Sequence, residues 1–250
     1  MIHPTAIIDK DAHVSADAEI GPYVIIEPNA RIGSRVRIMS HAYIARNTEI
    51  GDDTVIHVGA VLGGTPQDMA FQDKETYLKI GRRNVIREYV TIHRGTKEGT
   101  STVIGDDNYI MVAVHIGHNC HIHDRVIIAN SALLAGYVSV EDGAFISGNV
   151  VFHQFCRIGR LAMIGGFTGV NKDVPPYMVV RGPSVVWSVN LVGLRRAKFS
   201  RETIKEIKDA YDLVYCRGLN TEQALAKIME SGPCGEVRHF VDFIRATKRG

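Results

Sequence analysis

The sequence predicts a mainly β protein, in which a parallel β-helix is followed by a small α-helical domain. Three observations predict this fold class. An aliphatic residue recurs every six positions over most of the first 170 residues, and a small or β-branched residue recurs four positions after it. Beyond residue 186 this period is lost and helical spacing replaces it. A six-residue unit suits a short strand and one turn, and such units bury their side chains only by stacking on one another.

The aliphatic positions run in phase through three stretches, 2–62, 80–92 and 104–170, and every in-phase residue in them is apolar. Glycine often follows the aliphatic residue, as a tight corner favours. Three six-residue units complete one triangular coil. We therefore expect residues 18 apart to lie above one another at about 4.8 Å, the spacing of neighbouring strands. Residues 1–186 are predicted to form this β-helix.

Two interruptions of the period predict loops. The in-phase residues Asp68 and Lys74 are polar, and so is Glu98 further along. We expect loops near 63–79 and 94–103. Long loops in an otherwise regular solenoid usually carry function.

Residues 187–250 are predicted to form a basic helical domain. The paired prolines of DVPPY end the six-residue period. Ser200 is a candidate helix cap and precedes an apolar stripe at helical spacing, and two further helices are expected after it. From Trp187 onward the chain holds 12 basic and 8 acidic residues, so its surface should favour acidic partners.

Composition excludes several classes of protein. The chain of 250 residues is 45% hydrophobic and 22% charged, which is ordinary for a globular protein. A net charge of +2 gives no overall reason to expect nucleic acid, and no apolar run approaches the ~18 residues of a membrane span. The opening MIHPTAIID lacks the pattern of a signal peptide. Four scattered cysteines do not resemble a disulfide framework. We expect a cytoplasmic protein that binds no nucleic acid and has no membrane span.

The stretch HIGHNCHIHDR, residues 115–125, holds four histidines and invites comparison with a metal site. His115 and His121 are six apart, so they occupy equivalent places on different faces of the coil. His118 and His123 take different positions within their hexapeptides. Because zinc needs three or four ligands about 2 Å from one centre, we expect no metal site here.

Counting 18 residues along the coil from His118 leads to Gly136, and 18 more lead to Gln154. These three residues should therefore stack at one edge. Histidine can accept a proton near neutral pH. Glycine exposes its backbone N–H to a developing oxyanion, and the glutamine amide can bind a polar ligand. A corner glycine between two solvated side chains is the alternative interpretation of the same column.

Seven short motifs in combination resemble the family of cytoplasmic UDP-N-acetylglucosamine O-acyltransferases, which begin lipid A synthesis in Gram-negative bacteria. They are PQD at 66–68, TIHRGT at 91–96, HIGHNC at 115–120, LLAG at 133–136, HQFC at 153–156, DVPPY at 173–177 and GLRRAKFSRE at 193–202.

The resemblance covers essentially the whole chain and implies several properties that the period alone does not supply. It implies a left-handed β-helix and a homotrimer with active sites between neighbouring subunits. It also implies transfer of an (R)-3-hydroxyacyl chain from acyl carrier protein to the 3-hydroxyl of UDP-N-acetylglucosamine, with no cofactor beyond the loaded carrier.

The resemblance further implies roles for individual residues. The catalytic base falls on His118, with Asn119 beside it, and the oxyanion N–H falls on Gly136. Carrier-protein docking would use Arg195, Lys198 and Arg201, because acyl carrier proteins are acidic. The nucleotide sugar would be held by Gln67, Asp68, His115, Tyr137, His153, Gln154, Asn190 and Arg196, and acyl length would be measured by Met163, Gly166 and Pro183.

Four positions depart from the family pattern. Asn119 stands in place of the usual aspartate, Tyr137 in place of histidine, Ala70 in place of lysine and Ala197 in place of arginine. An aspartate would hold the base in one tautomer, whereas the NH2 group of Asn119 can donate and favour the wrong one. Two alternatives therefore stay open, an N-acyltransferase acting on a 3-amino sugar nucleotide and a binding paralogue with low activity.

Overall fold

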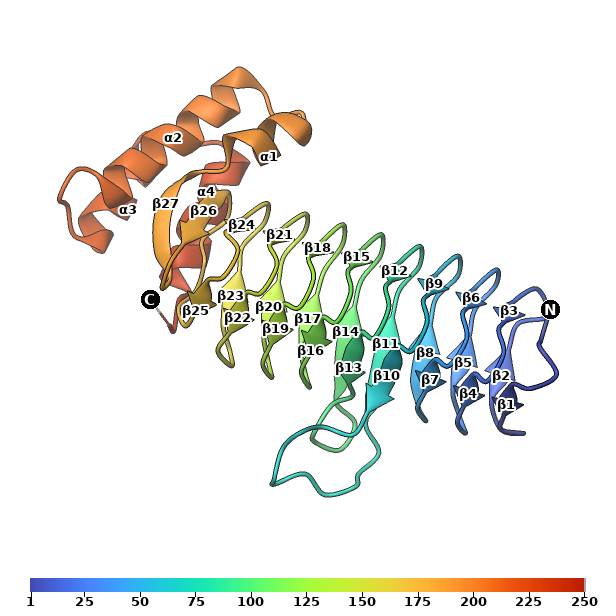
Figure 1. Ribbon diagram of the computed structural model, residues 1–250. Helices are drawn as coiled ribbons and strands as arrows, with labels where there is room; N and C mark the ends of the chain where they lie inside the picture. The colour runs from blue at the N-terminus through green and yellow to red at the C-terminus, as the bar shows by residue number, and fades with distance from the viewer. Residues whose placement is uncertain (250) are drawn as a thin grey trace.

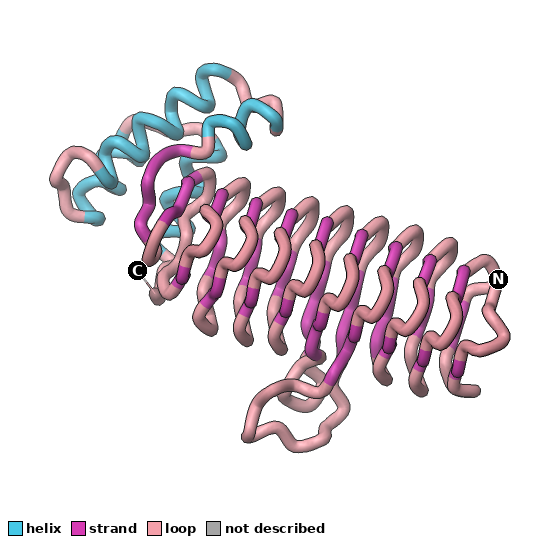
Figure 2. The backbone as a smooth tube through the Cα atoms, in the orientation of Figure 1, coloured by secondary structure: helices cyan, strands magenta, loops and turns pink. Residues whose placement is uncertain are grey.

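The computed structural model describes residues 1–249, which form a left-handed parallel β-helix with a helical domain at its C-terminal end (Figure 1). Three sheets, one on each side of a triangular coil, run along the β-helix. Figure 2 shows the strands stacked along the coil and the helices confined to the end nearest the C-terminus. The fold class that the sequence predicts is confirmed.

The first sheet contains, in spatial order, β1 (Ile7–Ile8), β4 (Ile25–Ile26), β7 (Tyr43–Ile44), β10 (Val61–Gly64), β13 (Thr91–His93), β16 (His115–Ile116), β19 (Leu133–Leu134), β22 (Val151–Phe152) and β25 (Gly169–Val170). The second contains β2 (His13–Val14), β5 (Arg31–Ile32), β8 (Thr48–Ile50), β11 (Tyr77–Ile80), β14 (Ser101–Ile104), β17 (His121–Ile122), β20 (Ser139–Val140) and β23 (Arg157–Ile158). The third contains β3 (Glu19–Ile20), β6 (Arg37–Ile38), β9 (Val55–Ile56), β12 (Val85–Ile86), β15 (Tyr109–Ile110), β18 (Ile127–Ile128), β21 (Phe145–Ile146), β24 (Met163–Ile164), β26 (Met178–Arg181) and β27 (Val185–Val189).

The register follows the six-residue period. Ile116 pairs with Leu134, 18 residues later, as expected for one full coil. Across the first loop, paired residues are 30 positions apart in the sequence, as Leu62 and Ile92 are. Across the second loop they are 24 positions apart, as Ile92 and Ile116 are. Each loop therefore adds whole hexapeptide lengths, and the aliphatic residues on both sides stay inside the coil. From Ile20 to Val170 every residue of the aliphatic frame is buried.

The three sheets meet at three edges. We call the edge between the first and second sheets the His118 edge, and the edge between the second and third sheets the charged edge. Many turns at the edges place a non-glycine residue in the left-handed backbone region, among them Asn119 at φ 58° and Tyr137 at φ 62°. Asparagine tolerates this conformation well, whereas tyrosine must be held there by its surroundings.

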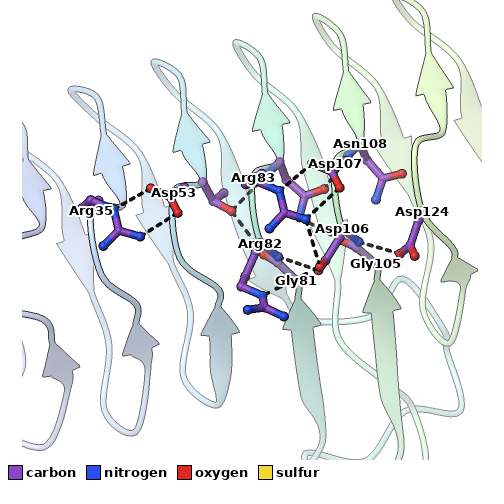
Figure 3. Close-up of polar contacts among 12 residues, drawn as sticks. Arg35, Asp53, Gly81, Arg82, Arg83, Gly105, Asp106, Asp107, Asn108 and Asp124 are labelled. Carbon is purple, nitrogen blue, oxygen red and sulfur yellow. Dashed lines mark hydrogen bonds and ion pairs between the residues drawn. The ribbon is translucent and has the colours of Figure 1, made fainter.

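Ion pairs run along the charged edge (Figure 3). Arg35 binds Asp53 of the next coil at 2.7 Å, and Arg83 binds Asp107 in the same way at 2.7 Å. Each arginine lowers the pKa of its aspartate through these hydrogen bonds. Because the pairs are exposed, each adds little to stability.

Within residues 1–249, four helices follow the β-helix. They are α1 (Leu191–Arg196), α2 (Arg201–Tyr215), α3 (Thr221–Glu230) and α4 (Gly235–Arg245). The expected cap is confirmed, because the Ser200 side chain accepts from the Thr203 N–H at 3.1 Å. The boundary placed after residue 186 falls within β27, which runs antiparallel to β26. No helix among residues 1–249 is both long enough and apolar enough to cross a membrane.

Polar contacts tie the helical domain to the end of the β-helix. Arg157 on β23 pairs with Asp173 at 2.9 Å and donates to the Phe243 carbonyl of α4 at 3.0 Å. Nε2 of His239, also on α4, lies 2.8 Å from a carboxylate oxygen of Glu141. A buried apolar cluster shared by β26, β27 and the helices accompanies these contacts, and together they hold the helical domain on the coil.

Candidate active site

The two loops and the His118 column occupy the same edge of the β-helix. The loop of residues 65–76 joins β10 to β11, and that of residues 94–100 joins β13 to β14, so each crosses from the first sheet to the second. Figure 1 shows both loops projecting on one side of the coil. The flanking strands extend into the expected loop ranges of 63–79 and 94–103, which makes both loops shorter than expected.

His118 lies directly against Gly136. A Cβ atom on Gly136 would stand 2.5 Å from Cε1 and 2.6 Å from Nε2 of the His118 ring, so only glycine leaves room for the imidazole. His118 is 7% exposed. Within residues 1–249 the Gly136 N–H donates to no protein acceptor. The stacking expected from the 18-residue spacing thus places an imidazole beside an uncommitted backbone donor.

Asn119 is held by the loop of residues 94–100. Its Oδ1 atom accepts from the Thr96 N–H at 3.1 Å and from the Thr96 hydroxyl at 2.8 Å. The same Oδ1 atom lies 3.0 Å from Nδ1 of His118. A backbone N–H can only donate, so the amide oxygen of Asn119, and not its NH2 group, must face Thr96.

This arrangement fixes the tautomer of His118. An amide oxygen can only accept, so the proton of the neutral imidazole sits on Nδ1. Nε2 then keeps a free lone pair, which is what a general base requires. The unfavourable arrangement weighed from the sequence, with the Asn119 NH2 group donating to the imidazole, is not the one in the structure.

Tyr137 forms a wall beside the imidazole. Its ring meets that of His118 edge to face at 5.2 Å and stacks on Phe155 at 4.8 Å. Its hydroxyl lies 3.2 Å from Oγ1 of Thr96. The tyrosine therefore joins the residues around the candidate base instead of pointing into solvent.

Two further histidines lie next to His118 in the fold. His115 places Nδ1 2.8 Å from the Thr91 hydroxyl, and burial lowers its pKa. His93 packs edge to face on His115 at 4.7 Å. Burial, followed by the nearby imidazoles of His115 and His118, lowers the pKa of His93 to about 4. Both are therefore neutral at pH 7 and can offer hydrogen bonds without charge.

Sequence reasoning missed His93, although the motif TIHRGT contains it. The sequence did contain one indication that His93 belongs to the site, because it lies beside the second interruption of the six-residue period. The two remaining histidines of the stretch lie away from His118, since His121 and His123 stack on each other at 4.2 Å on the side of the second sheet.

A buried arginine holds the loop that carries Gln67 and Asp68. Arg94 donates to the Gly63 carbonyl at 3.3 Å and to the Asp73 carboxylate at 2.9 Å. Asp68 closes the loop locally by accepting from the Ala70 N–H at 2.9 Å. The side chain of Gln67 is exposed. The first loop is thus an ordered element with polar side chains along the His118 edge.

His153 and Gln154 occupy the next turn of the same edge, and both are exposed. Nδ1 of His153 lies 3.1 Å from the Gln154 carbonyl oxygen and 3.0 Å from Nη1 of Arg249. Five of the predicted sugar-binding residues therefore lie along one edge, and the sixth, His115, lies beside it on β16 of the first sheet. The five are Gln67, Asp68, Tyr137, His153 and Gln154.

The other predicted residues lie elsewhere on the chain. Asn190, Arg196 and Met163 line a cleft of about 1300 Å³ between the third sheet and the helical domain. Asn190 also caps α1, because its side chain accepts from the Gly193 N–H at 3.0 Å and donates to the Leu161 carbonyl at 2.8 Å.

The remaining candidates are all exposed. Gly166 lies at the edge between the third and first sheets, and Pro183 lies in the turn between β26 and β27. The carrier-docking candidates Arg195, Lys198 and Arg201 lie on the surface of the helical domain. Apart from Gly166 and Pro183, one chain therefore carries two separate groups of candidate residues, those of the His118 edge and those of the cleft and helical domain.

Family models match most of the chain. The model described as Udp N-acetylglucosamine O-acyltransferase, domain 2, matches residues 173–250. The model described as bacterial transferase hexapeptide (six repeats) matches residues 29–64 and 101–136.

Individual proteins are similar over the full length. A curated acyl-(acyl-carrier-protein)–UDP-N-acetylglucosamine O-acyltransferase from Thermodesulfovibrio yellowstonii is 47% identical, covering 100% of this chain and 98% of the relative. A relative with the same name from Synechocystis sp. is 44% identical, and the match covers 98% of this chain and 89% of the relative. The crystal structure of a UDP-N-acetylglucosamine acyltransferase from Bacteroides fragilis has a TM-score of 0.97 at 42% identity, covering 100% and 99%. The chain therefore belongs to the family of UDP-N-acetylglucosamine O-acyltransferases.

Proposed function

We propose that this protein transfers an (R)-3-hydroxyacyl chain from acyl carrier protein to the 3-hydroxyl of UDP-N-acetylglucosamine, the first step of lipid A biosynthesis. The names of its relatives support the substrates and the reaction. The single observation that carries the chemistry is the His118 imidazole, whose Nδ1 is bound to Asn119 and whose Nε2 is free beside Gly136.

In the proposed mechanism, Nε2 of His118 removes the proton of the sugar 3-hydroxyl while that oxygen attacks the thioester carbonyl carbon. A sugar hydroxyl is a poor nucleophile until a positioned base takes its proton. The C–O bond forms, and negative charge collects on the former carbonyl oxygen. As this intermediate collapses, the C–S bond breaks and the protonated imidazole returns its proton to the thiolate of the carrier.

Gly136 supplies the proposed oxyanion donor. Its N–H has no protein acceptor within residues 1–249 and stands next to the His118 ring. A fixed backbone donor stabilises charge that develops only in the transition state, and it needs no reorganisation at that moment. The thioester is already activated, so the proposed mechanism needs neither a metal nor another cofactor.

The two groups of candidate residues favour an active site built between chains. The His118 edge and the cleft lined by Asn190 and Arg196 are on different parts of one chain, so a neighbouring copy would bring the second group to the first. We propose that the copies form a homotrimer, as the family resemblance implies, in the cytoplasm, with the acyl chain measured near Met163, Gly166 and Pro183.

The outer faces of the sheets support association of copies. On the first sheet the outward residues are mostly apolar, and they include Ile7 at 64% exposed, Leu133 at 43% and Val151 at 49%. On the second sheet they are mostly polar or charged, such as Arg31 and Lys79. Contiguous exposed apolar surface usually marks an interface, so the first sheet should face a neighbour and the second should face water.

The reaction itself is tested by mass spectrometry of products. The purified protein is given acyl carrier proteins of several acyl lengths together with UDP-N-acetylglucosamine or its 3-amino analogue. We expect an ester product from the first acceptor. An amide as the only product would establish the N-acyltransferase alternative, and binding without turnover on either acceptor would establish the paralogue of low activity.

The base is tested by His118→Ala, which should remove more than about 99% of kcat, because a positioned general base contributes roughly 10²–10⁴-fold. His121→Ala is the matched control, since His121 is exposed on the second sheet, away from the site. It should keep near-normal activity. A near-normal kcat for His118→Ala would rule out the base assignment.

A further inference from the structure

We infer that Thr96 is a positioning residue that acts on His118 through Asn119, and that this is the purpose of the loop of residues 94–100. The inference rests on the proposed role of His118 as the base. It adds Thr96 and its loop to the residues that prepare the candidate base, and neither could be identified from the repeat pattern or from Asn119 alone.

The hydrogen bonds around Asn119 form a chain with a single direction. Oδ1 of Asn119 has no proton, so the Thr96 hydroxyl at 2.8 Å must donate to it. Having used its proton, Oγ1 of Thr96 can only accept from the Tyr137 hydroxyl at 3.2 Å. Tyr137 therefore donates to Thr96, Thr96 donates to Asn119, and the Nδ1–H of His118 donates to the same Asn119 oxygen.

The two donors of Thr96 do different things. If the Asn119 amide were reversed, its NH2 group would face the Thr96 N–H, and two donors would oppose each other at about the same separation. The hydroxyl could adapt to the reversed amide by accepting, whereas the N–H cannot. The backbone N–H of Thr96 therefore selects the orientation of the Asn119 amide, and the shorter contact from the Thr96 hydroxyl holds the amide in place.

The loop presents Thr96 in a fixed position. The neighbouring Gly95 N–H donates to the Tyr77 carbonyl at 3.2 Å, and the Lys97 N–H donates to the Thr100 hydroxyl at 3.1 Å. A Cβ atom on Gly95 would stand 2.4 Å from the Thr100 carbonyl oxygen, so the loop closes tightly on itself there. The backbone of Asn119 is fixed independently, because its N–H donates to the Thr102 hydroxyl at 2.8 Å.

These hydrogen bonds orient an amide that, unlike a carboxylate, can point the wrong way. An aspartate at position 119 would accept from the imidazole through either oxygen and has no wrong orientation. An asparagine has one oxygen, which must be aimed at Nδ1. Thr96 should therefore matter in this chain and matter much less when residue 119 is aspartate. That difference separates positioning from a general structural role.

The first test is a double-mutant cycle on the O-acyl reaction. Thr96→Val removes the hydroxyl and keeps the N–H, and we expect kcat to fall about three- to tenfold, as the loss of one hydrogen bond implies. Thr96→Ser should restore it. In the Asn119→Asp background the same Thr96→Val change should alter kcat by less than about twofold. An equal fall in both backgrounds would reduce Thr96 to a structural residue and overturn the inference.

The second test isolates the backbone N–H. Residue 96 is replaced by the α-hydroxy acid corresponding to valine, which differs from Thr96→Val only by an ester in place of the amide. ¹⁵N NMR of the His118 imidazole should show the Nδ1–H tautomer alone in the native protein and in Thr96→Val, and a mixture in the ester. A single unchanged tautomer in the ester would contradict the inference. This readout does not depend on turnover, so a failure of His118 as base, seen with His118→Ala, is distinguishable from a failure of Thr96 to position it.

Discussion

At the scale of single residues, the backbone of Gly136 does not explain why glycine is needed there. Gly136 is outside the left-handed region, although its neighbour Tyr137 is inside it. The requirement comes from the imidazole of His118, which fills the space that a side chain would take. The glycine and the histidine are therefore one feature of the site, created by the 18-residue repeat.

Gly136→Ala should keep the fold and damage the reaction. The added methyl group overlaps the His118 ring, and the ring can move where the backbone cannot. Because misplacing a catalytic group by about 1 Å can cost about 10²-fold, we expect kcat to fall about 10- to 100-fold with little change in Tm. Gly235→Ala is the control, since a Cβ atom there, at the start of α4, meets nothing within 4 Å. Near-normal kcat for Gly136→Ala would show that the ring does not need its present position.

At the scale of elements, the helical domain packs on the last coils through a shared apolar cluster and a few polar contacts. The contact between His239 on α4 and Glu141 on the β-helix also depends on pH. The hydrogen bond and charge of Glu141 raise the pKa of His239 above its ordinary value of 6.5. The pair is fully formed below that value and is lost as pH rises through the raised pKa in the folded state.

The stability of the protein should therefore carry a component that declines as pH rises from about 6 to 8. His239→Gln should remove it, so that Tm falls less over this range than in the native protein. The pair is partly exposed, and we expect a difference of about 1–3 °C at most. His13→Gln, at an exposed site on β2, should leave the pH dependence unchanged. Identical curves for the native protein and His239→Gln would show that the contact adds nothing.

At the scale of the whole molecule, the C-terminal region carries an excess of positive charge. The helical domain is basic and presents Arg195, Lys198 and Arg201 to solvent. Lys205 is different, because its ammonium group binds Asp209 at 2.8 Å within α2. Within residues 1–249 the other three cations form no ion pair, which suits the acidic carrier proposed as the donor, and such contacts mainly accelerate encounter.

Added salt should therefore weaken binding of the acyl donor and have little effect on binding of the UDP-sugar acceptor. We expect KM for acyl carrier protein to rise with ionic strength, and the double change Arg195→Glu with Lys198→Glu to raise it about tenfold or more at low salt. KM for the UDP-sugar should change less than about twofold. Lys10→Glu, an exposed reversal at the far end of the β-helix, is the control. Equal use of acyl-coenzyme A and carrier protein at every ionic strength would contradict carrier docking.

The sequence by itself determined the features that arise from repetition. A period of six places the aliphatic residues inside, and a coil of 18 stacks His118 on Gly136, because each coil repeats the geometry of the one before. The capping role of Ser200 was also predictable, since caps depend on near neighbours. The interruptions of the period located both loops, although not their exact bounds.

Only the tertiary structure decided what the loops do. Thr96 meets Asn119 across 23 residues, and no period relates the two positions. The same holds for His93, for the buried Arg94, and for β27 and α1, whose places depend on packing against the last coils. The sequence left two orientations open for the Asn119 amide. A single backbone N–H from a non-repeating loop selects between them, because a donor cannot face a donor.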